Sequence, residues 1–517
     1  MKRKRTGICW FLAAVFIAML VMGYFSDATA AAARADKLTV ILSADPANLD
    51  PNDSDSQTHY QAVRNIYETL FVYDDNYNLT PWLCEKYEYQ DDSTIILHLR
   101  KGVKFHNGDE FKANDVYFTI KRVIDNKLAA MVEFSNILID KCEIIDDYTF
   151  KLVTNGPVAT QIPLLENPAA EIMNERAYKE ANGDFVKGAC VGTGPFQFVS
   201  YAPGDQLLLK AFDGYWREGE PHFDNLLIRF ISDSASRAIE AETGGADIVY
   251  DIGAKNLESV SAAKGVSIIA EVGTNTSHLL MNTSVAPLDN DLVRQAVWYG
   301  VDAKMAVKLA YGDFGAVATD WVCPGIKGSN PDLAANYFPA RDVEKAKKCL
   351  AEAGYANGVE LEIVVPSNNQ ERCDMAEVFQ AQLAEVGIKV KVNIMESSAW
   401  NAYILAGKQQ MTIYGFSAAD FEADRALVQF MPTSVNYNIC KFDNKEFQEI
   451  TAKSFVTLDE NERFQLYRDA ITILMKNHVT IPLWFKALNA AVKNDVTGFK
   501  ISRSYEHHYL QYVAPSK

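Results

Sequence analysis

The sequence predicts an α/β fold divided into at least two lobes, and three observations lead to that prediction. First, a chain of 517 residues exceeds what one hydrophobic core usually serves. Second, hydrophobic residues make up 48% and charged residues 23%, as in soluble globular proteins. Third, residues 360–394 read as a strand, a helix and a second strand, the unit from which parallel sheets are built.

The first thirty residues read as an export signal. Basic residues 2–5 precede an apolar run at 7–25, and Ala28-Thr29-Ala30 is the favoured cleavage site. The nearby Cys9 lies at the start of this run, whereas lipid attachment requires a cysteine just after it. We therefore expect a signal peptide at 1–30 without a lipobox, and a soluble periplasmic protein. An uncleaved membrane anchor is the alternative, because the run approaches the length of a membrane span.

Short apolar or alternating runs bounded by turn-forming residues predict strands in the first half of the chain. They cover residues 94–99, 149–153, 206–212, 226–231, 248–252 and 266–272. No tandem repeat, low-complexity stretch or long flexible linker interrupts the chain. We therefore expect short strand-like crossings between the lobes, which suit hinge closure.

The strand-helix-strand unit is the clearest architectural signal in the second half. Its helix places Phe379 and Leu383 on one stripe, and Gly387 follows as a stop signal. Further helices are expected at 342–353 and at 460–477, where Asp459 and Glu462 resemble a capping box. An α/β domain is expected in this region.

Several classes of function are excluded or unsupported. A net charge of −17 repels phosphate backbones and anionic lipid, so neither nucleic acid nor a membrane surface is expected as a partner. The chain contains no G-x-S-x-G, H-E-x-x-H, phosphate-loop or complete EF-hand motif, so we expect no enzyme, no cofactor and no metal site. The seven cysteines after the leader include no C-x-x-C pair, and their disulfide pairing is open.

Motifs spread over nearly the whole chain closely resemble family 5 of the ABC-importer solute-binding proteins, the class that takes peptides, nickel and opines. These motifs are Ile66-Tyr67-Glu68-Thr69-Leu70-Phe71, Leu79-Thr80-Pro81-Trp82-Leu83, the segments 97–108 and 111–116, Gly192-Thr193-Gly194-Pro195-Phe196, Gly214-Tyr215-Trp216, Met281-Asn282-Thr283, Val293-Arg294-Gln295-Ala296, the segment 346–354 and Ile481-Pro482-Leu483-Trp484. The resemblance implies a three-lobed fold like that of the type II periplasmic binding proteins, with a hinge and an interdomain ligand cleft.

The resemblance also implies a division of the chain. After the signal peptide, domain I takes residues 36–79, 191–275 and 489–517, domain II is inserted at 80–190, and domain III covers 276–488. The ligand is expected between domains I and III, where closure buries polar groups that must all be paired.

Seven residues are expected at the ligand by this resemblance: Gln57, Arg372, Trp400, Phe416, Ser417, Asp420 and Trp484. Peptide-binding relatives carry a Gly-Trp-x-Ala-Asp loop whose aspartate pairs with the peptide's ammonium group. Here the loop starts at Gly415-Phe416-Ser417, and a gapless alignment puts Ala419 at the aspartate position, so Asp420 fits only after a one-residue shift. Asp420 is therefore either the ammonium anchor or an exposed carboxylate.

The other expected contacts have structural alternatives. Arg372 corresponds to a basic residue facing the ligand's carboxylate, for which a guanidinium is suited, or it is a solvated charge at a helix start. Trp400 lines a side-chain pocket and Trp484 lies near the hinge, or both are ordinary core residues. Gln57, within the polar loop 54–58, meets the ligand from domain I or belongs to a plain surface loop.

The leading interpretation is a monomeric substrate-binding component of an ABC importer, which captures a di- or oligopeptide and delivers it to the permease subunits. The same fold binding a nickel chelate, an opine, a sugar or another small molecule is the near alternative. A membrane-anchored sensor ectodomain or an exported hydrolase is the alternative from another class.

Overall fold

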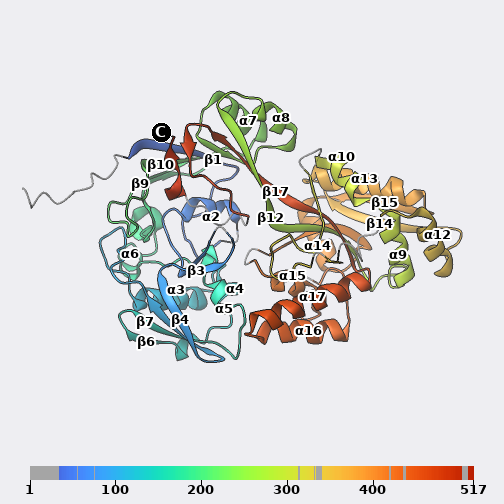
Figure 1. Cartoon of the computed structure of the whole chain (residues 1–517), viewed down its shortest axis with the longest axis horizontal. Helices are drawn as coiled ribbons and strands as arrows, with labels where there is room; N and C mark the ends of the chain where they lie inside the picture. Colours follow the sequence, from blue (N-terminus) through green and yellow to red (C-terminus); the bar gives the residue numbers. More distant parts are fainter. Residues whose placement is uncertain are drawn as a thin grey trace, which may run out of the picture.

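The computed structural model describes residues 34–516 apart from 55, 75, 312–314, 331, 334–339, 419–420, 435–437 and 504–509. The predicted signal peptide at 1–30 and the predicted site residue Asp420 therefore lie outside the described residues. Figure 1 shows two lobes joined by two long strands, β12 (Val266–Met281) and β17 (Thr480–Lys493). This arrangement confirms the predicted α/β class.

One mixed sheet of 11 strands runs through both lobes in the order β15-β14-β16-β12-β17-β11-β1-β10-β9-β8, with β13 beside β17. Besides β12 and β17, its strands are β1 (Ala35–Leu42), β8 (Phe196–Ala202), β9 (Gln206–Ala211), β10 (Phe223–Phe230), β11 (Ile248–Tyr250), β13 (Ala316–Val317), β14 (Val359–Pro366), β15 (Ile388–Met395) and β16 (Met411–Ser417).

Three smaller sheets accompany the large one. A four-stranded antiparallel sheet has the order β4-β5-β7-β6, and two pairs join β2 to β3 and β18 to β19. Their bounds are β2 (Phe71–Tyr73), β3 (Leu79–Pro81), β4 (Cys84–Asp91), β5 (Thr94–Leu99), β6 (Glu143–Asp146), β7 (Thr149–Val153), β18 (Val496–Thr497) and β19 (Ala514–Pro515). The predicted strands at 94–99 and 149–153 thus match β5 and β7.

Helices cover the faces of these sheets. Those before β12 are α2 (Gln57–Val63), α3 (Ala113–Asn126), α4 (Met131–Phe134), α5 (Gln161–Leu164), α6 (Glu175–Glu180), α7 (Ser234–Thr243) and α8 (Leu257–Ser261). Those after it are α9 (Asp291–Gly300), α10 (Ala303–Tyr311), α12 (Val343–Glu352), α13 (Gln370–Ala384), α14 (Ser397–Leu405), α15 (Asp424–Leu427), α16 (Lys445–Val456) and α17 (Glu460–Lys476). The Asp459 carboxylate accepts a hydrogen bond from the backbone N–H of Glu462 at 2.8 Å and caps α17.

The register of β12 against β17 marks where the lobes meet. Residues 266–272 pair with 487–493, residues 276–280 pair with 480–485, and a register shift separates Val272 from Thr276. We call residues 34–272 and 487–516 the first lobe, and residues 276–485 the second lobe. The shift lies next to the predicted domain boundary between 275 and 276, although the full set of domain bounds stays a prediction.

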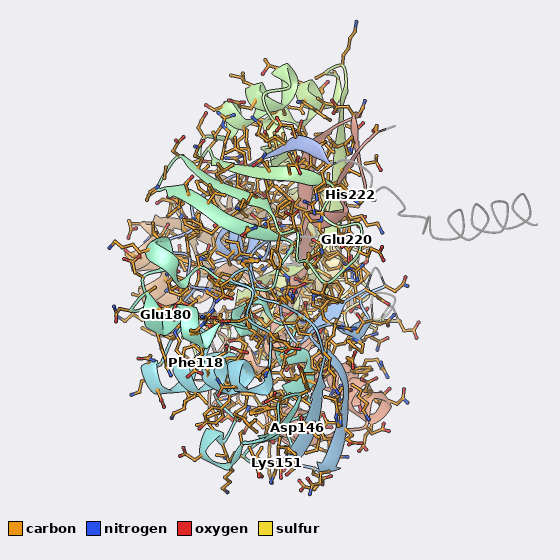
Figure 2. All side chains as sticks on the ribbon, turned by 90° about the vertical axis from the view of Figure 1, so that its left-hand side faces the viewer. Phe118, Asp146, Lys151, Glu180, Glu220 and His222 are labelled. Carbon is orange, nitrogen blue, oxygen red and sulfur yellow. The ribbon has the colours of Figure 1, made fainter. Side chains whose placement is uncertain are left out.

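Each lobe has its own hydrophobic core. The core of the second lobe packs β14 and β16 against α13 and α17, with Ile363, Phe379, Ile413 and Leu474 among its buried members. The larger of the two cores in the first lobe contains Leu226 of the large sheet together with Leu97 of the four-stranded sheet, and the smaller one packs α7 and α8 near β11. The segment predicted as domain II therefore shares a continuous interior with its host lobe. Figure 2 shows this lobe from outside, with Asp146 and Lys151 at one end and Glu220 and His222 toward the other.

The predicted strand-helix-strand unit is confirmed as β14, α13 and β15, and β14 and β15 pair in parallel. The strand predicted at 266–272 was placed too short, because β12 continues to Met281 and pairs there with β16 on its other side. The seven described cysteines are all free. Within the described ranges, no helix has the length and apolar character needed to cross a membrane.

Candidate functional site

In both lobes the carboxyl ends of the parallel strands lie near the register break of β12. In the second lobe β14, β15 and β16 are parallel, and Ser417 at the end of β16 lies opposite Asn275, inside the register break of β12. In the first lobe β1, β10 and β11 are parallel, and β11 ends opposite Ala490 of β17, close to the same break. Open α/β sheets bind ligands beyond the carboxyl ends of their strands. The cleft between the lobes is therefore the candidate site.

Arg372 lies at this edge, in the first turn of α13 after the end of β14. The Asn369 side chain caps α13 by accepting a hydrogen bond from the Arg372 backbone N–H at 2.9 Å, which fixes where the side chain starts. The Arg372 Nε is buried without a hydrogen-bond partner among the described residues, and none of their ion pairs includes Arg372. Burial lowers the pKa of Arg372. A partly buried cation without a fixed anion is therefore available to a ligand.

Aromatic rings surround this guanidinium. Its central carbon lies 5.6 Å from the centre of the Trp400 ring, a cation–π distance. Trp400 is itself stacked on Tyr414 at 6.0 Å, and its indole N–H donates to the Thr412 hydroxyl at 3.1 Å. Trp400 is 7% exposed, so it belongs to the core while supporting Arg372. The structure thus brings together Arg372 and Trp400 and adds Tyr414.

Tyr311 completes the group from the end of α10. Its ring centre lies 5.5 Å from that of Trp484, and its hydroxyl group interacts electrostatically with Arg372. Burial raises the pKa of Tyr311, so its hydroxyl stays protonated and can donate a hydrogen bond. We define Tyr311, Arg372, Trp400, Tyr414 and Trp484 as the Arg372 cluster. The sequence analysis missed Tyr311 and Tyr414, because nothing in their local pattern distinguishes them from ordinary core tyrosines.

The remaining predicted site residues are less closely associated with this cluster. Phe416 is 3% exposed and packs on Tyr414 at 5.6 Å, so it supports the cluster from the core. Ser417 is partly exposed, and its hydroxyl lies 3.5 Å from that of Thr274 at the hinge. Gln57 begins α2 in the first lobe, after the loop that follows β1. Asp420 and Ala419 lie outside the described residues.

The lobes also touch far from the hinge. Glu133 of α4 and Arg425 of α15 form an ion pair of 2.7 Å, and the backbone N–H of Ala159 donates to the carbonyl of Phe455 at 2.9 Å. Figure 1 shows α4 and α5 beside α15 and α16 at this second junction. The cleft is therefore bounded by the hinge strands on one side and by this contact on the other.

A cavity of about 830 Å³ opens at the hinge side of the junction. Its walls come from the β2–β3 hairpin, from β12 and from the C-terminal segment, and Phe421 is the lining residue contributed by the second lobe. None of the six predicted site residues that the structure describes lines it. Its volume suits a small ligand, but the Arg372 cluster is the better candidate for the principal site because it contains a partly buried charge whose Nε has no hydrogen-bond partner among the described residues.

The described residues hold no candidate site for a resident metal. Within the described residues, no group of three or more histidine, cysteine, aspartate or glutamate side chains has the arrangement that would hold a metal ion. The described cysteine thiols at 84, 190, 323 and 440 are buried, and burial raises the pKa of each. The geometry therefore supports ligand binding through a cation, aromatic rings and hydroxyl groups.

Comparisons with known proteins agree with this geometry. The family model described as bacterial extracellular solute-binding proteins, family 5, matches residues 78–438. The glutathione-binding protein GsiB of Escherichia coli strain K12 is 30% identical over 499 residues, which cover 93% of this chain and 96% of that protein. The periplasmic binding protein DppA of Helicobacter pylori, solved with the peptide STSA, is 25% identical with a TM-score of 0.74, covering 94% of this chain and 99% of that one. HbpA2 of Haemophilus parasuis superposes with a TM-score of 0.84 at 24% identity, over 93% and 100% of the two chains.

Proposed function

Because this chain belongs to family 5 of the bacterial extracellular solute-binding proteins, we propose that its cargo is a short peptide. The protein captures this di- or oligopeptide between its lobes and delivers it unchanged to the permease subunits of an ABC importer. The observation that carries the choice of a peptide is the Arg372 side chain, a partly buried guanidinium with no anion of its own. A peptide's carboxylate supplies the anion, and the flat guanidinium suits a two-pronged hydrogen bond to it.

The rest of the Arg372 cluster provides what a peptide needs beyond its carboxylate. Trp400 and Tyr414 offer apolar surface, and the Tyr311 hydroxyl offers a second donor near the same charge. Gln57, Ser417 and Asp420 complete the site in this proposal, with Asp420 as the anchor of the peptide's ammonium group. Glutathione is the first peptide to test, because the E. coli relative is named for it.

The cellular setting is proposed along with the cargo. The leader at residues 1–30 directs export to the periplasm, where the mature protein works as a monomer and meets the permease. The relative from Helicobacter pylori carries the description of a periplasmic, ABC-transporter-associated protein, which supports this placement. Mass spectrometry of the mature N-terminus tests it, since an intact leader contradicts the soluble carrier and favours an anchored sensor ectodomain.

The cargo is tested by ligand screening. Thermal unfolding is measured with glutathione, dipeptides and longer peptides, set against nickel chelates, opines and sugars. We expect a rise in the melting temperature with at least one peptide, because a ligand that binds the folded state stabilises it. A rise with a chelate, an opine or a sugar and none with any peptide contradicts the peptide proposal while preserving the carrier. Turnover of a ligand contradicts the carrier and supports a hydrolase.

Native mass spectrometry of protein purified from its own compartment gives independent evidence on the cargo. The mass of a retained ligand identifies its chemical class without a prior guess. We expect the mass of a short peptide, and a retained mass that corresponds to a sugar or a chelate contradicts the proposal.

A further inference from the structure

The cavity at the hinge is separate from the Arg372 cluster. None of its lining residues belongs to that cluster, and Phe421 is the contribution of the second lobe. The β2–β3 hairpin and β12 belong to or border the first lobe, and Figure 1 shows β3 on the side of that lobe that faces the junction. At about 830 Å³ the cavity has the size of a small-molecule site. The cavity is therefore large enough to hold a ligand of its own, and the chemistry of its walls indicates which kind.

Aromatic rings contribute to two parts of the wall. On one part, Phe421 packs against Tyr73 and Tyr77 with ring centres 4.8 Å and 4.5 Å away. On the other, the guanidinium of Arg217 lies 4.7 Å from the Trp82 ring and 5.6 Å from the Tyr512 ring. These side chains contribute apolar surface to the wall, which suits a ligand with an aromatic or apolar body.

Most of the charged groups in the wall have partners in the protein. Arg217 forms a two-pronged ion pair with Glu220 at 3.0 Å for both contacts, so its charge is balanced. The Asp74 carboxylate accepts hydrogen bonds from the backbone N–H groups of Asn76 and Asn78 at 2.8 Å and 2.9 Å. Asp74 and Arg217 are therefore held by the fold.

Glu271 is the exception. It projects from β12, is exposed, and lines the cavity. Among the described side chains it makes no ion pair and no hydrogen bond. A carboxylate beside aromatic rings is the combination that binds an organic ammonium ion, through charge and through cation–π attraction.

We propose that this cavity is a second ligand site, which takes an organic ammonium ion with an aromatic or apolar body and anchors its charge on Glu271. The proposal goes beyond the capture of a peptide, because it concerns a different set of residues. A ligand placed there touches Phe421 as well as the first lobe, so its binding also bears on how the lobes come together.

The test uses 5-fluorotryptamine as the probe and fluorine NMR of the full-length mature protein as the readout. We expect saturable binding, and binding about tenfold weaker for the anionic analogue 5-fluoroindole-3-propionate, because only the amine pairs with Glu271. Glu271→Gln should weaken amine binding by about tenfold as well. Ile269→Trp, which fills the cavity from β12, should abolish it.

Two controls separate this proposal from the peptide proposal. Glu258→Gln removes an exposed carboxylate of α8 outside the cavity and should leave amine binding unchanged. Arg372→Met should also leave amine binding unchanged, whatever it does to peptides. Absence of saturable amine binding, equal binding of the anion, or full binding by Glu271→Gln overturns the second site. Competition between the amine and a bound peptide also overturns it, because the cavity is then part of the cargo site.

Discussion

One buried ionisable side chain in each lobe differs in how completely it is hydrogen-bonded. In the first lobe the Glu68 carboxylate is 6% exposed and accepts hydrogen bonds from Trp82 at 2.8 Å, Tyr215 at 2.9 Å and Thr193 at 2.7 Å. In the second lobe Arg372 is partly buried, and its Nε has no partner among the described residues. Burying a charge is tolerated when every hydrogen bond is made and costs free energy when one is missing. The comparison indicates a structural role for Glu68, and we propose a ligand-binding role for Arg372.

Two other buried arginines contrast with Arg372. In the second lobe Arg463 makes two hydrogen bonds to Glu422, at 3.0 Å and 2.9 Å. In the first lobe Arg64 contacts Glu166 at 2.9 Å. The fold supplies anions for these two arginines, and we propose that a ligand supplies the anion at Arg372.

The largest expected effect comes from the first lobe. Glu68→Leu leaves the buried N–H and O–H donors of Trp82, Tyr215 and Thr193 without an acceptor, so the free energy of unfolding should fall by about 3–5 kcal/mol. Urea denaturation measures this. The matched control is Glu85→Leu on the exposed surface of β4, which should change stability by less than about 0.5 kcal/mol. Equal effects of the two variants would remove the contrast between the lobes.

The next effect comes from the second lobe and concerns ligand affinity rather than the stability of the ligand-free protein. Arg372→Met removes a cation that no described group balances, so the ligand-free protein should lose no stability. Peptide affinity should fall by about 1.5–3 kcal/mol, because a charged hydrogen bond is lost. Titration calorimetry and thermal unfolding measure the two quantities, with Arg468→Met on the exposed face of α17 as control. A loss of ligand-free stability with unchanged affinity would make Arg372 a structural residue.

A third effect is graded with pH and sharpens the comparison. Both carboxylate oxygens of Glu171 are buried without a partner among the described residues, near Arg64, Glu68 and Glu166, and burial raises the pKa of Glu171 well above its usual range. The folded state therefore holds a proton that the unfolded state releases. The free energy of unfolding should fall by up to about 1.4 kcal/mol per pH unit as pH rises above the unfolded-state pKa of about 4.3.

Glu171→Gln tests this, because glutamine is neutral at every pH. Urea denaturation between about pH 5 and pH 8 measures the free energy of unfolding of both proteins. This free energy should fall less steeply with rising pH in the variant, which therefore becomes more stable relative to the native protein as pH rises. Parallel pH profiles of the two proteins would show that Glu171 is already ionised in the folded state.

Much of the fold was predictable because its signals are local. The alternation of residues 388–392 and the apolar residues from Leu361 give β15 and β14, and the stripe through Phe379 gives α13. The second half of β12 was missed because the alternation of apolar and polar residues stops at the polar residues after Gly273. That half is held by β16 and β17, which are distant in the sequence.

The site was predictable only in part. Arg372, Trp400 and Trp484 were found through the family resemblance, and their packing could not be read from the residues themselves. Tyr311 and Tyr414 were missed because their proximity to Arg372 depends on how α10 and β16 pack against the start of α13. Asp420 and the ammonium anchor stay a prediction, since that residue lies outside the described part of the chain.

The central claim is that the carboxylate of a captured peptide binds the Arg372 guanidinium, and one calorimetric comparison tests it most directly. The tightest-binding peptide and its C-terminal amide are titrated into the native protein and into Arg372→Met. Amidation should weaken binding to the native protein by about tenfold or more and should have almost no effect on the variant, because the variant has already lost the partner of the carboxylate. Equal losses in both proteins, or no loss in either, would contradict the claim.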